Sequence, residues 1–334
     1  MLKMPKEPAL PALRTTSLPL DDAHGLPRIL ASARQFAEEA AAREPQAFVA
    51  LVEEHVRRVQ RLPRESASLS LSARGSELWL SWDAASVRLP VVPPEPARIT
   101  VVPPPQSPPR SQPPPARPVG PPPEVRVHMR GWGWLPEPRL QAVLLERPHP
   151  REQHSGDSAL IERHGSRLRL AVVDGLGHGP AAREAAVRTA TSLTTSFRDE
   201  LQDSVLAAHD LVATTRGATL GVADIDLAAR NVRATTVGNV RVAMFFGGGR
   251  TWSPCGTDAV LGHGRGTLHG RLAVRVEQHP VPSDTIFALF SDGLQNQLRL
   301  PMQRTADLSE MALTLFATYS VPNDDATLML VSCT

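Results

Sequence analysis

The sequence has few cysteines and no long apolar run. Its two cysteines, Cys255 and Cys333, match neither a CxxC pair nor a Cys/His zinc spacing, which leaves one disulfide or, as the default in a reducing compartment, two buried thiols. Nowhere do ~18 apolar residues follow one another, so we expect no membrane-spanning helix and no membrane partner. The N-terminus also lacks the apolar core of a signal peptide. These absences favour a cytoplasmic protein.

A strong excess of one charge is also lacking. The chain has 36 Lys and Arg against 34 Asp and Glu, a formal net charge of +2. Its basic residues are scattered rather than clustered, which excludes a dedicated nucleic-acid-binding protein and predicts no nucleic-acid partner. With 334 residues the chain is long enough for about two domains.

Proline is concentrated in one stretch, residues 90–124, where nearly half of the residues are proline. Proline fixes φ and removes a backbone donor, so this stretch is predicted to be an extended, semi-rigid linker. A ligand for proline-recognising domains is the alternative. The linker divides the chain into a small N-terminal domain, residues 1–89, and a larger domain, residues 125–334.

The N-terminal domain is predicted to contain two helices within 26–62 and a hairpin of strands 68–72 and 77–82. This order resembles the core of GHKL-type ATPases such as the anti-sigma kinases. Those ATPases need a helical Asn for magnesium and a later Asp-x-Gly. Helix 46–61 has no Asn, and the hairpin ends in Asp83-Ala84-Ala85. We therefore expect a degenerate regulatory module without catalysis.

After the linker, strands dominate and helices come in two blocks, which predicts an α+β fold rather than an alternating parallel sheet. Gly179 followed by Pro180 is typical of a helix start. The predicted strands are 140–146, 159–163, 167–173, 218–223, 231–237, 241–246, 272–276, 285–291 and 326–331, and the predicted helices are 180–215 and 308–319.

Aspartates recur at the ends of these apolar strands. Asp157 precedes strand 159–163, Asp174 and Asp292 each follow a strand, and Asp324 with Asp325 precede the last strand. Carboxylates that converge repel one another unless cations neutralise them, and oxygen ligands suit magnesium or manganese rather than zinc.

The simpler interpretation of each Asp-Gly pair is a hairpin turn. A two-residue hairpin needs a return strand at once, whereas Asp174-Gly175 leads into a helix and Asp292-Gly293 into Leu294-Gln295-Asn296-Gln297. Both glycines therefore mark corners where the backbone comes close to something, with a bound ion or phosphate as one candidate.

Four ordered motifs carry a specific resemblance: Ser155-Gly156-Asp157, VVDGLGHGPAA from Val172, SDGL from Ser291 and DDATLMLV from Asp324. Together they resemble the PPM family, the two-C-type protein phosphatases, and most closely its bacterial SpoIIE/RsbX branch. The likeness covers about residues 138–332. It implies an αββα sandwich, that is, two antiparallel sheets flanked by helices, with the site at one end.

The resemblance also implies roles for single residues. Asp174 would bridge two Mn²⁺ or Mg²⁺ ions, the carbonyl of Gly175 would bind one, and Asp292 and Asp324 would bind the other. Asp157 would act through water, and Asp325 would lie behind the ligands. His178, three residues after Gly175, either protonates the leaving oxygen or is a structural residue of its loop. His154 and Arg151 lie nearby in sequence without an assigned role, and the substrate-binding residues are unknown.

The implied activity is a hydrolase of stress-response signal transduction. A water activated by two metal ions would attack phosphoserine or phosphothreonine on a bacterial regulatory protein, with STAS-domain proteins as the implied partners. No CxxxxxR nucleophile motif is present, which fits a mechanism without a covalent intermediate. The alternatives are a pseudo-phosphatase that only binds its partner, and a scaffold that works through its N-terminal region.

Overall fold

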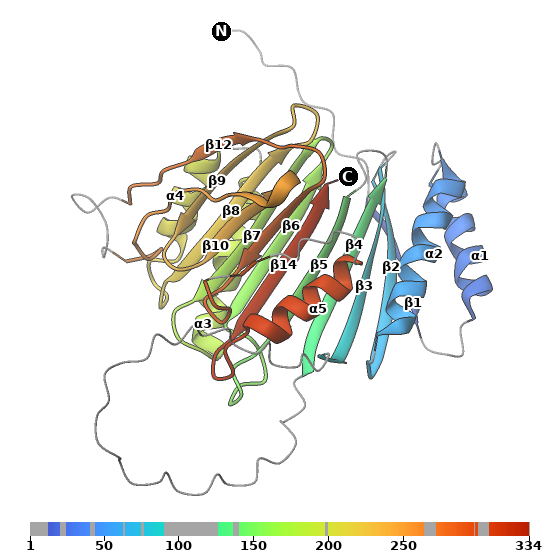
Figure 1. Ribbon diagram of the computed structural model, residues 1–334, viewed down its shortest axis with the longest axis horizontal. Coiled ribbons are helices and arrows are strands. Elements are labelled where there is room, and N and C mark those ends of the chain that lie inside the picture. Colours follow the sequence, from blue (N-terminus) through green and yellow to red (C-terminus); the bar gives the residue numbers. More distant parts are fainter. Residues whose placement is uncertain are drawn as a thin grey trace, which may run out of the picture.

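The computed structural model describes residues 13–20, 25–40, 44–62, 64–74, 77–89, 126–135, 140–197, 200–263, 272–296, 298–299 and 307–333. Their helices and strands form four layers, with two antiparallel sheets between two layers of helices (Figure 1). The predicted αββα sandwich is confirmed.

One sheet has nine strands in the order β1-β2-β3-β4-β5-β14-β13-β10-β11. Its strands are β1 (Leu13–Pro19), β2 (Ser66–Arg74), β3 (Glu77–Arg88), β4 (Arg126–Leu135), β5 (Leu140–Arg147), β14 (Ala326–Cys333), β13 (Thr285–Phe290), β10 (Arg241–Phe246) and β11 (Arg250–Trp252). A short 3-10 helix, η1 (Gly247–Gly249), joins β10 to β11.

The other sheet has five strands in the order β12-β9-β8-β7-β6. They are β12 (Glu277–Pro280), β9 (Asn231–Val237), β8 (Ala218–Asp226), β7 (Arg167–Gly175) and β6 (Asp157–His164). The helices are α1 (Leu26–Glu39), α2 (Pro45–Arg61), α3 (Pro180–Thr195), α4 (Leu201–Leu211) and α5 (Leu308–Tyr319).

Three apolar cores hold these layers together. Side chains of α1, α2 and α5 pack on one face of the nine-stranded sheet, the two sheets pack face to face, and α3 and α4 pack on the outer face of the five-stranded sheet. β14 shows why: Leu328 and Leu330 belong to the first core, whereas Met329 and Val331 belong to the core between the sheets. Successive side chains of a strand face opposite ways, so a strand buried on both faces is apolar throughout.

Residues 13–89 continue the sheet of the C-terminal strands. β3 pairs with β4 from Leu78↔Leu135 to Arg88↔Arg126, although the proline-rich stretch separates them in sequence. α1 and α2 share one core with α5 (Figure 1). Residues 90–124 lie outside the described part of the chain, so the linker and the three-part division remain predictions.

A buried arginine ties α2 to α5. The Arg58 guanidinium lies against the carboxylate of Asp307, which also accepts a hydrogen bond of 2.8 Å from the Ser309 N–H at the start of α5. Glu54 accepts from the same guanidinium at 3.1 Å. The N-terminal helices therefore contact the helix that leads towards Asp324.

Some predicted boundaries were wrong. The helix predicted over 180–215 is two helices, α3 and α4. Arg169 of β7 is the physical reason, because its Nη1 donates to the carbonyls of Leu193 and Ser196 at 3.0 and 3.1 Å where α3 ends. The strand predicted at 272–276 is not a strand: Val274 and Val276 pack on the helix-covered core, and pairing begins only with β12.

Other features were missed or confirmed. β1 and β4 were not predicted, whereas the hairpin of β2 and β3 is confirmed and longer than expected. Cys255 and Cys333 are free thiols, and only Cys333 is buried. Among the described residues, none of the helices combines the length and apolar character needed to cross a membrane.

Candidate active site

Strand ends from both sheets meet at one end of the sandwich and carry the five predicted aspartates. Asp157 begins β6 directly opposite Asp174 near the end of β7, and Asp174 lies opposite Thr219 of β8. In the other sheet, Asp292 follows β13 and Asp324 precedes β14. In antiparallel neighbours the end of one strand lies beside the beginning of the next.

Hydrogen bonds join the two sheets at this end. The Ser291 hydroxyl donates to Asp157 Oδ2 at 2.7 Å and accepts from the Thr327 N–H at 3.0 Å. Asn239 Nδ2 donates to Asp292 Oδ2 at 2.6 Å. The Asp157 and Asp292 side chains are therefore held in place by neutral donors.

Thr219 completes this network. Its hydroxyl has one proton, and the contact of 2.6 Å to Asn239 Oδ1 is far better than the contact of 3.4 Å to Asp174 Oδ2. The carboxylate of Asp174 therefore receives only this long contact from Thr219.

The aspartates lie close enough together for the charge of one to raise the pKa of another. Burial, and after it the negative charges of Asp157, Asp292 and Asp324, together raise the pKa of Asp174 to about 9.

The pKa of Asp157 is raised to about 7, mainly by burial and to a smaller extent by the charges of Asp325 and Asp292, while the hydrogen bond from Ser291 opposes the rise. The pKa of Asp292 is raised by burial and then by Asp324. Without cations, this end of the molecule therefore retains protons.

Asp325 lies behind this cluster and is 3% exposed. Its Oδ1 accepts from the His149 N–H at 2.7 Å, and its buried Oδ2 has no hydrogen-bond partner among the residues that the structure describes. Arg147 holds the preceding loop, because it donates to Ser320 Oγ at 3.2 Å and to the Asp324 carbonyl at 3.4 Å.

The two Asp-Gly glycines serve close packing of the chain on itself. A Cβ at Gly175 would lie 2.0 Å from the carbonyl oxygen of Ala182 in α3, and a Cβ at Gly293 would lie 1.8 Å from that of Asp325. What comes close at both corners is therefore the backbone of this chain.

His178 is exposed and does not belong to the aspartate network. Its Nδ1 lies 2.7 Å from Glu152 Oε1, and its ring stacks on that of His149 with centroids 4.3 Å apart. His154 and Arg151 are also exposed on the loop before Asp157. Glu152 of the same loop contacts His178 and therefore restrains its ring.

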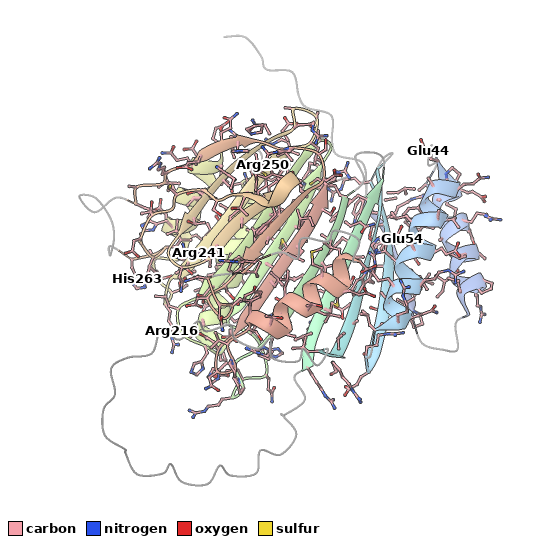
Figure 2. All side chains as sticks on the ribbon, in the orientation of Figure 1. Glu44, Glu54, Arg216, Arg241, Arg250 and His263 are labelled. Carbon is pink, nitrogen blue, oxygen red and sulfur yellow. The ribbon has the colours of Figure 1, made fainter. Side chains whose placement is uncertain are left out.

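Two exposed arginines stand at strand ends of the same region, Arg216 just before β8 and Arg241 at the start of β10 (Figure 2). A Cβ at Gly177 would lie 3.2 Å from Arg216 Nη1, which places this guanidinium against the loop that carries His178. Arg241 Nε donates to Asn296 Oδ1 at 3.3 Å. Within the described ranges neither forms an ion pair with a carboxylate, so both present positive charge beside the aspartates.

The types of oxygen ligand in this cluster are those that bind divalent cations. Carboxylates and a backbone carbonyl are the ligands of Mg²⁺ and Mn²⁺, and raised pKa values mark a negative charge that lacks compensation. Among the described residues, however, no three His, Cys, Asp or Glu side chains lie close enough together to hold an ion as they stand. Binding would therefore require the side chains to draw together.

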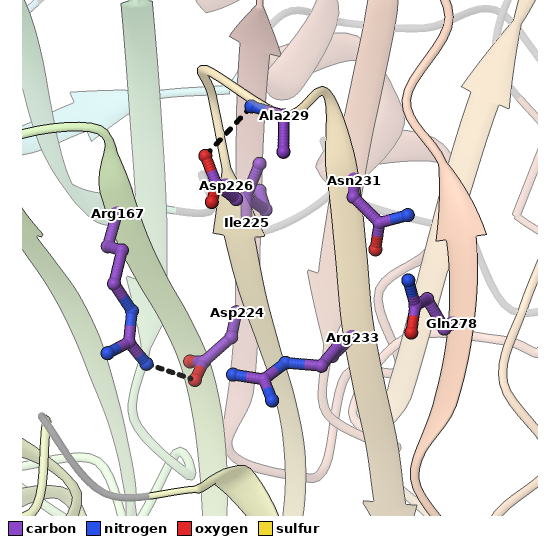
Figure 3. Close-up of a pocket in the computed structure, with 8 residues that line it drawn as sticks. All are labelled: Arg167, Asp224, Ile225, Asp226, Ala229, Asn231, Arg233 and Gln278. Carbon is purple, nitrogen blue, oxygen red and sulfur yellow. Dashed lines mark hydrogen bonds and ion pairs between the residues drawn. The ribbon is translucent and has the colours of Figure 1, made fainter.

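A hollow of about 300 Å³ lies at the other end of the five-stranded sheet, away from the aspartates (Figure 3). Arg167, which lines it, precedes Asp174 by seven residues of one strand, or about 23 Å. The carboxylate of Asp224 in this hollow is already engaged, because Arg169 donates to its two oxygens at 2.6 and 2.7 Å. This hollow is therefore not an extension of the aspartate cluster.

Sequence reasoning did not find the residues that orient the aspartates. They are Thr219, Asn239, Ser291 and Arg147. Thr219, Asn239 and Ser291 stand at strand ends, as the aspartates do, and that shared position was the available signal. Arg147 and Glu152 gave no comparable signal, because their partners are distant in sequence.

Comparison with known proteins gives one family and several similar chains. The model of the family described as stage II sporulation protein E (SpoIIE) matches residues 164–334. Phosphoserine phosphatase RsbX of Bacillus subtilis (strain 168) is 22% identical over 197 residues, which cover 57% of this chain and 94% of RsbX.

Two solved structures share the fold. A crystal structure of RsbX in complex with magnesium is 20% identical, covers 60% of this chain and 98% of its own, and has a TM-score of 0.52. A chain described under "The bacterial stressosome: a modular system that has been adapted to control secondary messenger signaling" is 24% identical, covers 57% and 98%, and has a TM-score of 0.53.

Proposed function

This chain belongs to the SpoIIE family of two-C-type phosphatases, and from that premise we propose that it hydrolyses phosphoserine or phosphothreonine on a bacterial regulatory protein in a metal-dependent reaction. One observation supports the proposal above all: aspartates from both sheets meet at one end of the sandwich and raise one another's pKa. Such a cluster suits divalent cations and a phosphate substrate.

The residues that would hold two Mn²⁺ or Mg²⁺ ions are Asp157, Asp174, Asp292, Asp324 and the carbonyl of Gly175. Asp325 would support them from behind. When bound, such ions lower the pKa of a water and offset charge on phosphoryl oxygens. The protein itself orients Asp157 and Asp292 through Ser291 and Asn239.

His178 is the proposed proton donor to the leaving serine or threonine oxygen. A carboxylate only accepts hydrogen bonds, so the Nδ1 proton of His178 faces Glu152. The proton that would pass to the leaving oxygen is the one that the imidazolium form carries on Nε2, and the neutral imidazole would remain. Arg216 and Arg241 would attract the phosphate, because their guanidinium groups offset the repulsion between a phosphate dianion and the aspartates.

The proposed partner is a phosphorylated STAS-domain protein. The relatives support a regulatory partner, since one is named for RsbX and another for the stressosome. The STAS domain itself rests on the motif resemblance. No nucleic acid or membrane takes part in the proposed reaction.

Hydrolysis of p-nitrophenyl phosphate with and without Mn²⁺ or Mg²⁺ tests the activity. We expect turnover that EDTA abolishes and that falls at least 100-fold in Asp174→Asn, while Asp203→Asn on the exposed side of α4 retains it. A wild-type protein without metal-dependent turnover of this substrate or of a phosphoserine peptide would overturn the proposal and favour the pseudo-phosphatase.

A further inference from the structure

A groove of about 640 Å³ opens between the loop before Asp157 and helix α3. One wall is the loop of residues 151–154, and the other is the first half of α3, with Pro180, Arg183, Glu184 and Val187. The volume lies within the range of ligand-binding clefts. The groove is therefore large enough for several side chains of a partner.

Residues of the groove contact residues of the candidate active site. Glu152, which lines it, binds His178 at 2.7 Å. Arg183 Nη1 donates to the Ser155 carbonyl at 3.2 Å, and Ser155 Oγ accepts from the Asp157 N–H at 3.2 Å. When a substrate protein places its phosphorylated residue at the aspartates, the segment next to that residue can therefore reach the groove.

The two glutamates and two arginines that line the groove differ in whether they have a partner of opposite charge. Glu152 is engaged by His178 and Glu184 by Arg188, at 2.7 and 3.4 Å. Across the described part of the chain, neither Arg151 nor Arg183 forms an ion pair with a carboxylate. The groove therefore offers two uncompensated guanidinium groups.

The groove also contains an exposed apolar side chain. Val187 is 41% exposed, and it and Leu211 of α4 are the large hydrophobic side chains that stand exposed among the described residues. Val187 lines the groove, whereas Leu211 does not. An apolar side chain in the same groove as two guanidinium groups without a carboxylate partner suits an amphipathic partner segment.

Building on the proposed function, we propose that this groove is the docking site for the substrate protein and that it takes an acidic segment next to the phosphorylated residue, with one apolar side chain against Val187. We choose an acidic segment because its charge is complementary to the guanidinium groups of Arg151 and Arg183. Opposite charges across an interface raise the association rate and exclude partners of like charge. The aspartates would then act on the phosphate while the groove selects the protein that carries it.

The test compares two peptides that share a phosphoserine and a neighbouring leucine, one flanked by glutamates and the other by lysines. We measure the binding of each peptide to the full chain by fluorescence anisotropy and its hydrolysis as kcat/KM. We expect the acidic peptide to bind at least tenfold more tightly and this preference to reverse in Arg151→Glu/Arg183→Glu. Equal binding of both peptides, or an unchanged preference in the double variant, would overturn the proposal.

Val187→Glu provides a second variant, with Leu211→Glu as its matched control. We expect Val187→Glu to weaken binding of the acidic peptide at least fivefold and Leu211→Glu to leave it unchanged. Equal effects of the two variants would contradict the proposal that the peptide binds in the groove. This pair keeps the proposal testable if the double arginine variant does not fold.

Binding is measured separately from turnover, so the two proposals can fail separately. A chain that binds the acidic peptide through the groove but hydrolyses nothing refutes only the phosphatase. A chain that hydrolyses both peptides equally and binds them equally refutes only the docking site. Concentration-dependent dimers that the groove variants abolish would show that a second copy occupies the groove, which also overturns the proposal.

Discussion

The Ser291 hydroxyl donates a hydrogen bond of 2.7 Å to Asp157 Oδ2. Ser291 follows β13 in the nine-stranded sheet, and Asp157 begins β6 in the five-stranded sheet. Both residues are buried, with 1% of each exposed. This bond therefore fixes the distance between the sheets where the aspartates gather.

Ser291→Ala should destabilise the protein. The substitution leaves Asp157 Oδ2 and the Thr327 N–H without their partner, which costs ~1–3 kcal/mol of unfolding free energy for a buried group. Urea denaturation followed by circular dichroism measures it. Ser332→Ala, near the end of β14, is the control and should change the free energy by less than ~0.5 kcal/mol. Equal effects would show that the bond between the sheets contributes nothing.

Without divalent cations, stability should fall as the pH rises from 5 to 9. Asp157 and Asp174 have folded pKa values of about 7 and about 9, above their ordinary value near 3.8. The folded state therefore binds more protons than the unfolded state in this window, and it loses up to ~1.4 kcal/mol per pH unit for each such group.

Melting temperatures in EDTA across this pH range test the expectation. Mn²⁺ should flatten the decline, because a cation replaces the protons. Asp174→Asn should flatten it without metal. A melting temperature that rises with pH in EDTA would contradict the raised pKa values.

Arg169→Met should lower the unfolding free energy by ~3–5 kcal/mol, the usual cost of leaving one partner of a buried ion pair alone. Arg169 is 0% exposed, pairs with both oxygens of Asp224 and holds the end of α3. Denaturant titration measures the loss.

Arg167→Met is the matched control. Arg167 lies on the same face at 3.6 Å from Asp224 and is 36% exposed, so its loss should cost ~0–1 kcal/mol. Arg169→Met/Asp224→Leu should recover part of the stability, since it removes both charges. A double variant as unstable as the single one would show that the contacts of Arg169 with α3 dominate.

Removal of residues 1–124 should lead to aggregation. β4 would become an edge strand, and the apolar face that α1 and α2 cover would be exposed. Light scattering of the shortened chain against the full chain measures the effect. A monomer with unchanged melting temperature and activity would contradict it and would also remove the scaffold alternative.

Much of the C-terminal fold could be predicted because its signals are local. The apolar run of β14 and the Gly179-Pro180 start of α3 each depend on neighbouring residues. The strand-end aspartates could likewise be predicted to converge, since antiparallel neighbours bring such ends together. Their ligand roles stay predictions.

Contacts between distant residues could not be predicted. The end of α3 depends on Arg169 of β7, and the contact of α2 with α5 depends on Arg58 and Asp307, which are 249 residues apart. β1 and β4 are strands because of their partners in the sheet rather than because of a strong pattern of their own. Sequence patterns indicate elements, but they do not give the order of strands across a sheet.

The pairing of β3 with β4 has a consequence for how the chain can be divided. Residues 13–89 are held against residues 126–333 by nine register partners and a common core rather than by the connection between them. A cut within that connection removes no described contact. The two pieces are therefore suited to fragment complementation, with activity recovered when both halves are produced together and assemble along this seam.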